Sequence, residues 1–154
     1  MATRTYADTS VSGGVCDAQF RHPSEAFLSQ VREGRFGLVT SVVVRQEIEP
    51  APASVAHLFA EMADHAEIVE LSEEALALQR GYLAHGVVGA KRAPDALHIA
   101  LATVASCSVL VSWNFRHHVH VVKIRMYNAV NALQGYRGIA THSPAEVIYY
   151  EEEL

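Results

Sequence analysis

The sequence predicts an α/β fold, a three-layer α/β/α sandwich with a mostly parallel central sheet. Short apolar segments alternate with segments that carry helix start and stop signals, the pattern of parallel strands joined through helices. Residues 109–112 are apolar without polar alternation, which is typical of a strand buried on both faces. The chain has 154 residues, 50% hydrophobic and 19% charged, which fits one domain over residues 1–154.

The first part of the chain contains two predicted strands with a helix between them. Residues 4–7 are short and β-prone, and the Ser- and Gly-rich segment that follows, through Gly14, predicts a loop. Pro23 predicts the start of a helix that runs to Glu33, because the next residue is a glycine that ends it. Residues 36–40 are apolar and predict a strand.

The middle of the chain continues the alternation. Residues 41–48 could extend the preceding strand or begin a helix; the helix formers in their second half and the prolines that follow favour a helix. Residues 53–65 predict a helix with one apolar face, and residues 68–71 a short strand. Ser72 has the side chain of an N-cap and precedes two glutamates, so a helix is predicted from there to His85.

The last part of the chain carries three further start signals. Pro94 predicts the first turn of a helix that leads to the strand at 109–112. Residues 123–133 have a helical pattern, and residues 139–141 are a candidate last strand. Ser143-Pro144-Ala145-Glu146 is a capping box with proline at the first helical position.

Composition limits the class of protein. The N-terminus is polar and short, unlike a signal peptide, and the apolar runs are too short to span a bilayer, so we expect a cytoplasmic protein. Cys16 and Cys107 fit no metal or redox spacing, and we expect both to be small buried side chains. The formal net charge of −5 argues mildly against tight, autonomous RNA binding, because phosphate contacts supply most of that affinity. Glu151–Glu153 predicts a solvated tail.

Four polar side chains are predicted to lie at the carboxyl ends of strands, where open parallel sheets bind ligands. They are Asp8 after the first strand, Glu47 after the second, Asp95 in the first turn of a later helix, and Asn114 after the strand at 109–112. Clustered carboxylates repel one another unless a cation compensates them, and Mg²⁺ or Mn²⁺ match such oxygen ligands. Each acid also has an ordinary alternative, as a turn cap, a surface residue or a helix-start acid.

Four motifs in this order resemble those of PIN-domain proteins, which include the VapC-like toxins of bacterial toxin–antitoxin pairs. The motifs are Tyr6-Ala7-Asp8-Thr9-Ser10, residues 41–47, Asp95-Ala96-Leu97-His98-Ile99-Ala100, and Leu110-Val111-Ser112-Trp113-Asn114-Phe115. The resemblance spans Tyr6 to about Phe115, and the capping box at 143–146 is consistent with it. It implies a PIN-like sandwich with a mostly parallel sheet.

The resemblance also implies a function. It implies a metal-dependent endoribonuclease, the toxin of a type II pair, in which Asp8, Glu47 and Asp95 hold Mg²⁺ or Mn²⁺ or its water. An RNA substrate, a cognate antitoxin protein and a homodimer follow from the same resemblance. Asn114 departs from the family pattern, because many members carry a fourth acid there. An amide brings no charge, but it can coordinate a metal through its oxygen or orient the metal-bound water, and the resemblance implies this catalytic role for Asn114. This departure and the acidic net charge support the alternative, a catalytically weak PIN-like module that binds RNA or protein.

Nine histidines are many for this length. His117, His118 and His120 could form a metal site or belong to a solvated loop; we favour the loop, because no cysteine or helical pairing completes a tetrahedral set. His98 lies one helical turn after Asp95. It could orient a carboxylate or touch substrate, but a satisfied, partly buried histidine is the favoured interpretation.

Several residues near the candidate acids have two interpretations. Thr9 and Ser10 could support the metal site through their hydroxyls or form a turn. Trp113 could stack on a base, but packing is the favoured interpretation. The basic side chains around the site could contact phosphates or be solvated; these are Lys91, Arg92, Arg116 and Lys123.

Overall fold

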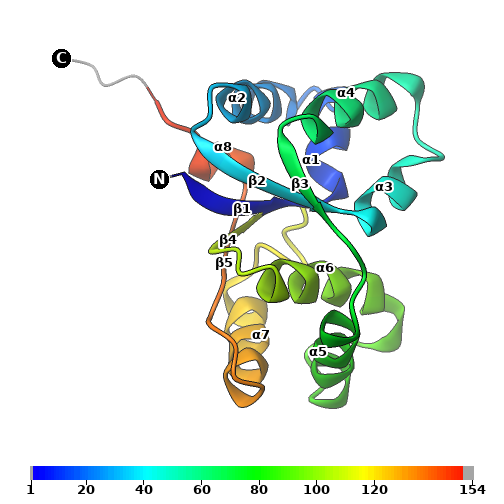
Figure 1. Cartoon of the computed structure of the whole chain (residues 1–154), viewed down its shortest axis with the longest axis vertical. Helices are drawn as coiled ribbons and strands as arrows, with labels where there is room; N and C mark the ends of the chain where they lie inside the picture. Colours follow the sequence, from blue (N-terminus) through cyan, green and yellow to red (C-terminus); the bar gives the residue numbers. More distant parts are fainter. Residues whose placement is uncertain (1, 151–154) are drawn as a thin grey trace.

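The chain folds around a parallel β-sheet (Figure 1). The computed structural model describes residues 2–150, so the predicted tail at Glu151–Glu153 lies outside the described residues. The strands are β1 (Thr3–Ala7), β2 (Phe36–Ser41), β3 (Ala66–Val69), β4 (Val109–Val111) and β5 (Ala140–His142). They form one five-stranded sheet of order β3-β2-β1-β4-β5, and every neighbouring pair is parallel. The predicted α/β class is confirmed.

Helices cover both faces of the sheet. They are α1 (Thr9–Gly13), α2 (Arg21–Arg32), α3 (Val42–Ile48), α4 (Ala53–Ala63), α5 (Glu73–Ala84), α6 (Ala93–Val104), α7 (Val121–Leu133) and α8 (Pro144–Val147), with 3-10 turns at Gly14–Cys16 and Ala90–Arg92. In Figure 1, α1, α2, α4 and α8 lie on one face, and α5, α6 and α7 lie on the other. This is the predicted sandwich. No helix within residues 2–150 combines the length and apolarity that a bilayer crossing requires.

Local sequence signals begin and end several of these helices as predicted. The Ser72 hydroxyl accepts a hydrogen bond from Ala75 N at 3.2 Å and so caps α5. Gly34 and Gly86, which follow α2 and α5, have φ angles of +80° and +70°, a conformation that glycine adopts without steric cost. The predicted capping box at the start of α8 is present, with both of its hydrogen bonds.

The predicted loop before Gly14 is wrong, because residues 9–13 form helix α1. Asp8 causes this helix to begin: its Oδ1 accepts a hydrogen bond from Ser10 N at 3.1 Å, which satisfies a backbone donor of the first turn. Small polar residues at a helix start can therefore resemble a loop in sequence. Asp8 therefore lies between the end of β1 and the start of α1, with its side chain hydrogen-bonded to the first turn of the helix.

Three other boundaries differ from, or resolve, the predictions. Helix α2 begins at Arg21, ahead of Pro23, since proline is tolerated throughout the first turn. Strand β3 begins at Ala66 because its register with β2 pairs that residue with Leu38. Residues 41–48 are helical after their first residue, and Ser41 both ends β2 and caps α3 through a hydrogen bond from Val44 N.

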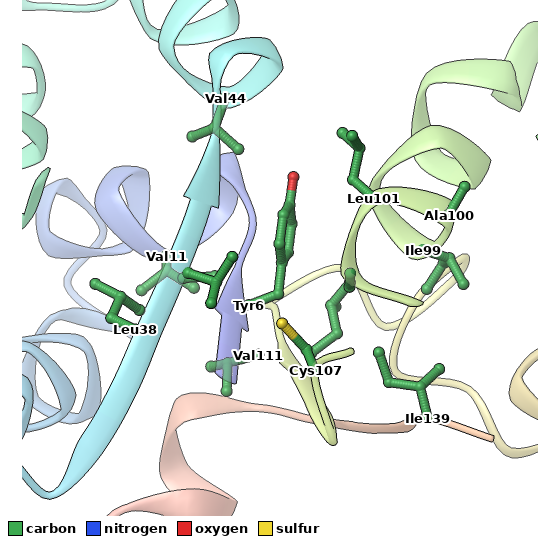
Figure 2. Packing of buried hydrophobic residues seen from close by; sticks show 14 of the residues in the cluster. Tyr6, Val11, Leu38, Val44, Ile99, Ala100, Leu101, Cys107, Val111 and Ile139 are labelled. Carbon is green, nitrogen blue, oxygen red and sulfur yellow. The ribbon is translucent and has the colours of Figure 1, made fainter. Parts of the chain in front are cut away.

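The buried core lies on both faces of the sheet (Figure 2). The side chains of Tyr6 and Leu38 point in opposite directions, because Tyr6 is in register with Val39 and not with Leu38. Tyr6 faces helix α6, where Leu101 lies, and carries its hydroxyl toward the end of β2. A polar group therefore enters the core beside the carboxyl edge of the sheet.

The two cysteines differ in exposure. Cys107 is buried as predicted, and burial raises the pKa of its thiol to about 12. Cys16 is exposed, so the prediction of a buried side chain is wrong for it. It ends the surface turn that follows α1, and its Sγ lies 3.7 Å from Ser54 Oγ.

Candidate active site

The predicted site residues occupy the carboxyl edge of the sheet. Asp8 follows β1 directly, Glu47 lies on the helix that begins where β2 ends, and Asn114 comes three residues after β4. Asp95 lies in the first turn of α6, whose other end leads into β4, so this turn belongs to the same edge. We call Asp8, Glu47, Asp95 and Asn114 the acidic site. A cavity of about 320 Å³ lies elsewhere, beside Cys107 at the start of β4, and none of the four lines it.

Asp8 accepts hydrogen bonds on both carboxylate oxygens. Its Oδ1 accepts from the backbone N and the hydroxyl of Ser10, at 3.1 and 2.5 Å. Its Oδ2 accepts from the Ser112 hydroxyl at 2.5 Å and from His118 Nδ1 at 2.8 Å. A carboxylate offers about four lone-pair positions. All four are occupied by the protein itself.

His118 lies between Asp8 and the main chain of Asp95. Its Nε2 lies 2.9 Å from the Asp95 carbonyl oxygen, which can only accept, so Nε2 donates. Its Nδ1 donates to Asp8 Oδ2, so both ring nitrogens carry hydrogen and the ring is an imidazolium. The exposed fractions are 1% for His118 and 4% for Asp8, which makes this a buried ion pair.

Glu47 accepts a hydrogen bond from a second histidine, His98, whose other ring nitrogen contacts a chain of two hydroxyl groups. Its Oε1 accepts from Thr9 Oγ1 at 2.8 Å and from His98 Nε2 at 2.5 Å. The other ring nitrogen, His98 Nδ1, lies 2.8 Å from the Tyr6 hydroxyl, which in turn lies 2.8 Å from Ser41 Oγ. This chain links the end of β2 to Glu47 through the buried core. The Glu47 side chain is 37% exposed, in contrast to Asp8.

Asp95 and Asn114 form the third part of the acidic site. Asn114 Nδ2 lies 3.4 Å from Asp95 Oδ1, a long hydrogen bond. Asn114 Oδ1 accepts from the backbone N of His117 at 2.9 Å. The side-chain NH₂ of Asn114 therefore faces Asp95, while its side-chain oxygen accepts a hydrogen bond from the backbone of the turn that contains Asn114.

The electrostatics follow from these contacts. Burial raises the pKa of Asp8, but the hydrogen bond and charge of His118, with smaller contributions from the charge of His98 and the hydrogen bond from Ser10, hold that pKa below its usual range. Burial lowers the pKa of His118, but the hydrogen bond and charge of Asp8 outweigh it and raise that pKa. Burial also raises the pKa of Glu47, but the hydrogen bond and charge of His98, together with the hydrogen bond from Thr9, hold that pKa below its usual value. Both carboxylates are therefore ionised and partnered.

The donor chemistry of the acidic site is that of a hard-cation site, but its arrangement does not fit direct binding of a metal ion at Asp8. The lone pairs of Asp8 are occupied, and Asn114 does not turn its oxygen toward Asp95. Within residues 2–150, no three His, Cys, Asp or Glu side chains are grouped to hold a metal ion. Glu47 Oε2 and Asp95 Oδ2 are the oxygens outside the hydrogen bonds just described.

The structure decides between several interpretations of neighbouring residues. Ser10 and Thr9 donate hydrogen bonds to Asp8 and Glu47, and their support of a metal site stays a prediction. His98 is a satisfied, buried histidine that also orients a carboxylate, although the carboxylate is Glu47 and not Asp95. Trp113 packs, as favoured: its ring stacks on Phe20 with centroids 4.2 Å apart.

The favoured assignment of the histidine cluster to a solvated loop is wrong for His118, because the turn after β4 places this ring against Asp8. His120 instead caps α7. Sequence reasoning also missed Ser112, which donates to Asp8. The one local signal that Ser112 and His118 belong to the site was their closeness in sequence to Asn114.

The predicted basic rim lies partly around His117. The charges of Arg92, Arg116 and Lys123 act on its ring, although burial is the largest cause that lowers the pKa of His117. Both of its ring nitrogens are buried and have no hydrogen-bond partner within residues 2–150. Lys123 Nζ donates to the carbonyl of Val87. Phosphate binding by this rim stays a prediction.

The fold and the order of these elements are PIN-like. The sequence matches no protein-family model and no curated protein.

A solved structure with the same architecture gives the more particular comparison. It is the crystal structure of VapBC2 from Rickettsia felis bound to a DNA fragment from their promoter. The match covers 92% of this chain and 98% of that chain, with a TM-score of 0.58 and 11% sequence identity. Similarity at this identity concerns the fold.

Proposed function

We propose that this chain is a PIN-type endoribonuclease that requires Mg²⁺ or Mn²⁺ and acts in the cytoplasm as the toxin of a toxin–antitoxin pair. The observation that carries the proposal is the hydrogen-bond network that links Asp8, Asp95 and Asn114 at the carboxyl edge of a PIN-like sheet, the edge where Glu47 also lies. His118 bridges Asp8 and the main chain of Asp95, and Asn114 contacts the Asp95 carboxylate. Carboxylates gathered at such an edge suit a cation that activates water and stabilises charge on a phosphate.

The partner part of the proposal rests on the structural neighbour. That protein is described as VapBC2, bound to promoter DNA. We propose that this chain pairs with a small antitoxin protein; that it also forms a homodimer is proposed from the resemblance to PIN-domain toxins. Copurification of the product of an adjoining reading frame, together with the mass of the complex in solution, tests both points.

The test of cleavage uses purified protein and end-labelled RNAs of mixed sequence. We expect cleavage with Mn²⁺ or Mg²⁺ and none with chelator. Asp95→Asn should abolish cleavage, because Asp95 offers an oxygen that no described side chain occupies. Asp64→Asn, an exposed acid at the end of α4, is the matched control and should cleave like the unaltered protein. Metal-independent cleavage, or full activity of Asp95→Asn, would contradict the proposal.

A second candidate function is a PIN-like module that binds RNA or a partner protein without cutting. The saturation of Asp8 favours it, since a carboxylate with four protein hydrogen bonds has no position left for a metal. RNA binding that survives in chelator, without cleavage at any metal concentration, would select this candidate.

A further inference from the structure

We infer that His118 is an internal competitor for the metal: its ring occupies the Asp8 carboxylate and must leave before a cation can bind there. The inference rests on the proposed metal-dependent function. His118 lowers the affinity of the acidic site for metal, and it stabilises the metal-free protein.

The first support is the completeness of the Asp8 coordination. Two of its hydrogen bonds come from Ser10 in helix α1, and a third comes from Ser112, which directly follows β4. The fourth comes from His118, the only donor among these groups that brings a positive charge. A buried carboxylate needs such a charge, because burial alone would neutralise it.

The second support is that His118 is anchored at both ends. Its Nε2 donates to the Asp95 carbonyl while its Nδ1 faces Asp8, and the ring is almost fully buried. A ring held by two hydrogen bonds does not swing aside freely. The cation must therefore replace both the charge and the position of the imidazolium.

The third support is the contrast with the other histidine of the site. His98 also donates to a carboxylate, but its partner Glu47 is partly exposed and keeps Oε2 outside the hydrogen bonds described. His98 therefore leaves Glu47 able to bind a cation. His118, in contrast, occupies the Asp8 carboxylate and prevents a cation from binding to it.

The test measures Mn²⁺ binding by calorimetry, with thermal unfolding as a second readout. In His118→Leu and His118→Gln we expect Mn²⁺ affinity at least tenfold above that of the unaltered protein. The metal-free forms should unfold at lower temperature, because Asp8 is left as a buried charge without its counter-ion. Mn²⁺ should raise their unfolding temperature more than that of the unaltered protein.

Two controls make the result specific. His57→Gln, at a histidine whose side chain is 79% exposed on α4, should leave Mn²⁺ binding and unfolding unchanged. The double variant Asp8→Asn/His118→Leu should be more stable without metal than His118→Leu, and should lose the Mn²⁺ response. Unaltered Mn²⁺ affinity in folded His118→Leu and His118→Gln would overturn the inference. So would failure of both variants to fold even with excess Mn²⁺.

The same samples separate this inference from the proposed function. Tighter Mn²⁺ binding by the His118 variants without RNA cleavage would reject the endoribonuclease and leave the inference intact. Cleavage by the unaltered protein, with Mn²⁺ affinity unchanged in the His118 variants, would reject the inference and leave the function intact.

Discussion

His118 donates a hydrogen bond to Asp8 across 2.8 Å, although the two residues lie 110 positions apart in the chain. Both side chains are buried, so the pair is shielded from solvent and from screening by salt. Its strength therefore depends on the protonation of both groups.

The pair predicts a pH window for stability in the absence of metal. The lowered pKa of Asp8 contributes stability above the usual value of 3.8, which is lost as pH falls through the folded pKa. The raised pKa of His118 contributes stability that is complete below the usual 6.5 and is lost as pH rises through the folded pKa. Urea unfolding should show that His118→Gln costs most between pH 3.8 and 6.5, about 3–5 kcal/mol, and less at alkaline pH. An equal cost at all pH values would contradict this.

Asn114→Asp should strengthen metal binding and weaken the metal-free protein. The new carboxylate would lie beside Asp95, where the amide now donates at 3.4 Å. Repulsion between two charges at this range is roughly 1–4 kcal/mol, and a divalent cation turns it into attraction. Calorimetry should show tighter Mn²⁺ binding, and Asp8→Asn should show weaker binding. If neither substitution alters Mn²⁺ affinity, these residues do not form a metal site and the non-cleaving module becomes the leading function.

Tyr6→Phe should cost about 1–3 kcal/mol of stability, because it leaves Ser41 and His98 without their buried hydroxyl partner. Tyr127→Phe is the matched control. The Tyr127 hydroxyl is buried and has no hydrogen-bond partner in the described part of the chain. Its removal should leave stability unchanged or raise it. The free energy of unfolding of both variants is measured in urea. Equal losses would show that the hydrogen bonds of the Tyr6 hydroxyl add no stability beyond that of an unpaired buried hydroxyl.

Two adjacent glycines should respond oppositely to alanine. A Cβ on Gly14 would lie 2.5 Å from Ser24 Oγ and 2.7 Å from Trp113 Nε1, so Gly14→Ala should destabilise by about 1–3 kcal/mol. It should also shift tryptophan fluorescence, since Trp113 is the only tryptophan. A Cβ on Gly13 meets nothing within 4 Å, and its φ of −64° is helical, so Gly13→Ala should stabilise by about 0.4–1 kcal/mol. The same sign for both substitutions would refute the packing described around Gly14.

Where the controlling interactions are local, sequence reasoning identified the elements. Ser72 caps α5 with a backbone donor three residues away, and the capping box of α8 spans four residues. The alternation of apolar runs with capped helices predicted the parallel sheet, because that connection requires helices between strands. The loop predicted over residues 9–13 is wrong because a Ser- and Gly-rich composition does not show that Asp8 caps a helix there.

The acidic site shows what the sequence by itself determined and what only the tertiary structure decided. The sequence determined the residue types and the strand ends at which Asp8, Glu47, Asp95 and Asn114 lie. The tertiary structure decided which of their carboxylate oxygens already accept hydrogen bonds from the protein. Strand β1 pairs with β4, which sets Ala7 beside Val111 and brings the turn after β4 to Asp8. A histidine in a polar turn carries no local mark of burial. Asp8, near the other end of the chain, is the partner that raises the pKa of His118, so His118 joins the site only when the sheet folds.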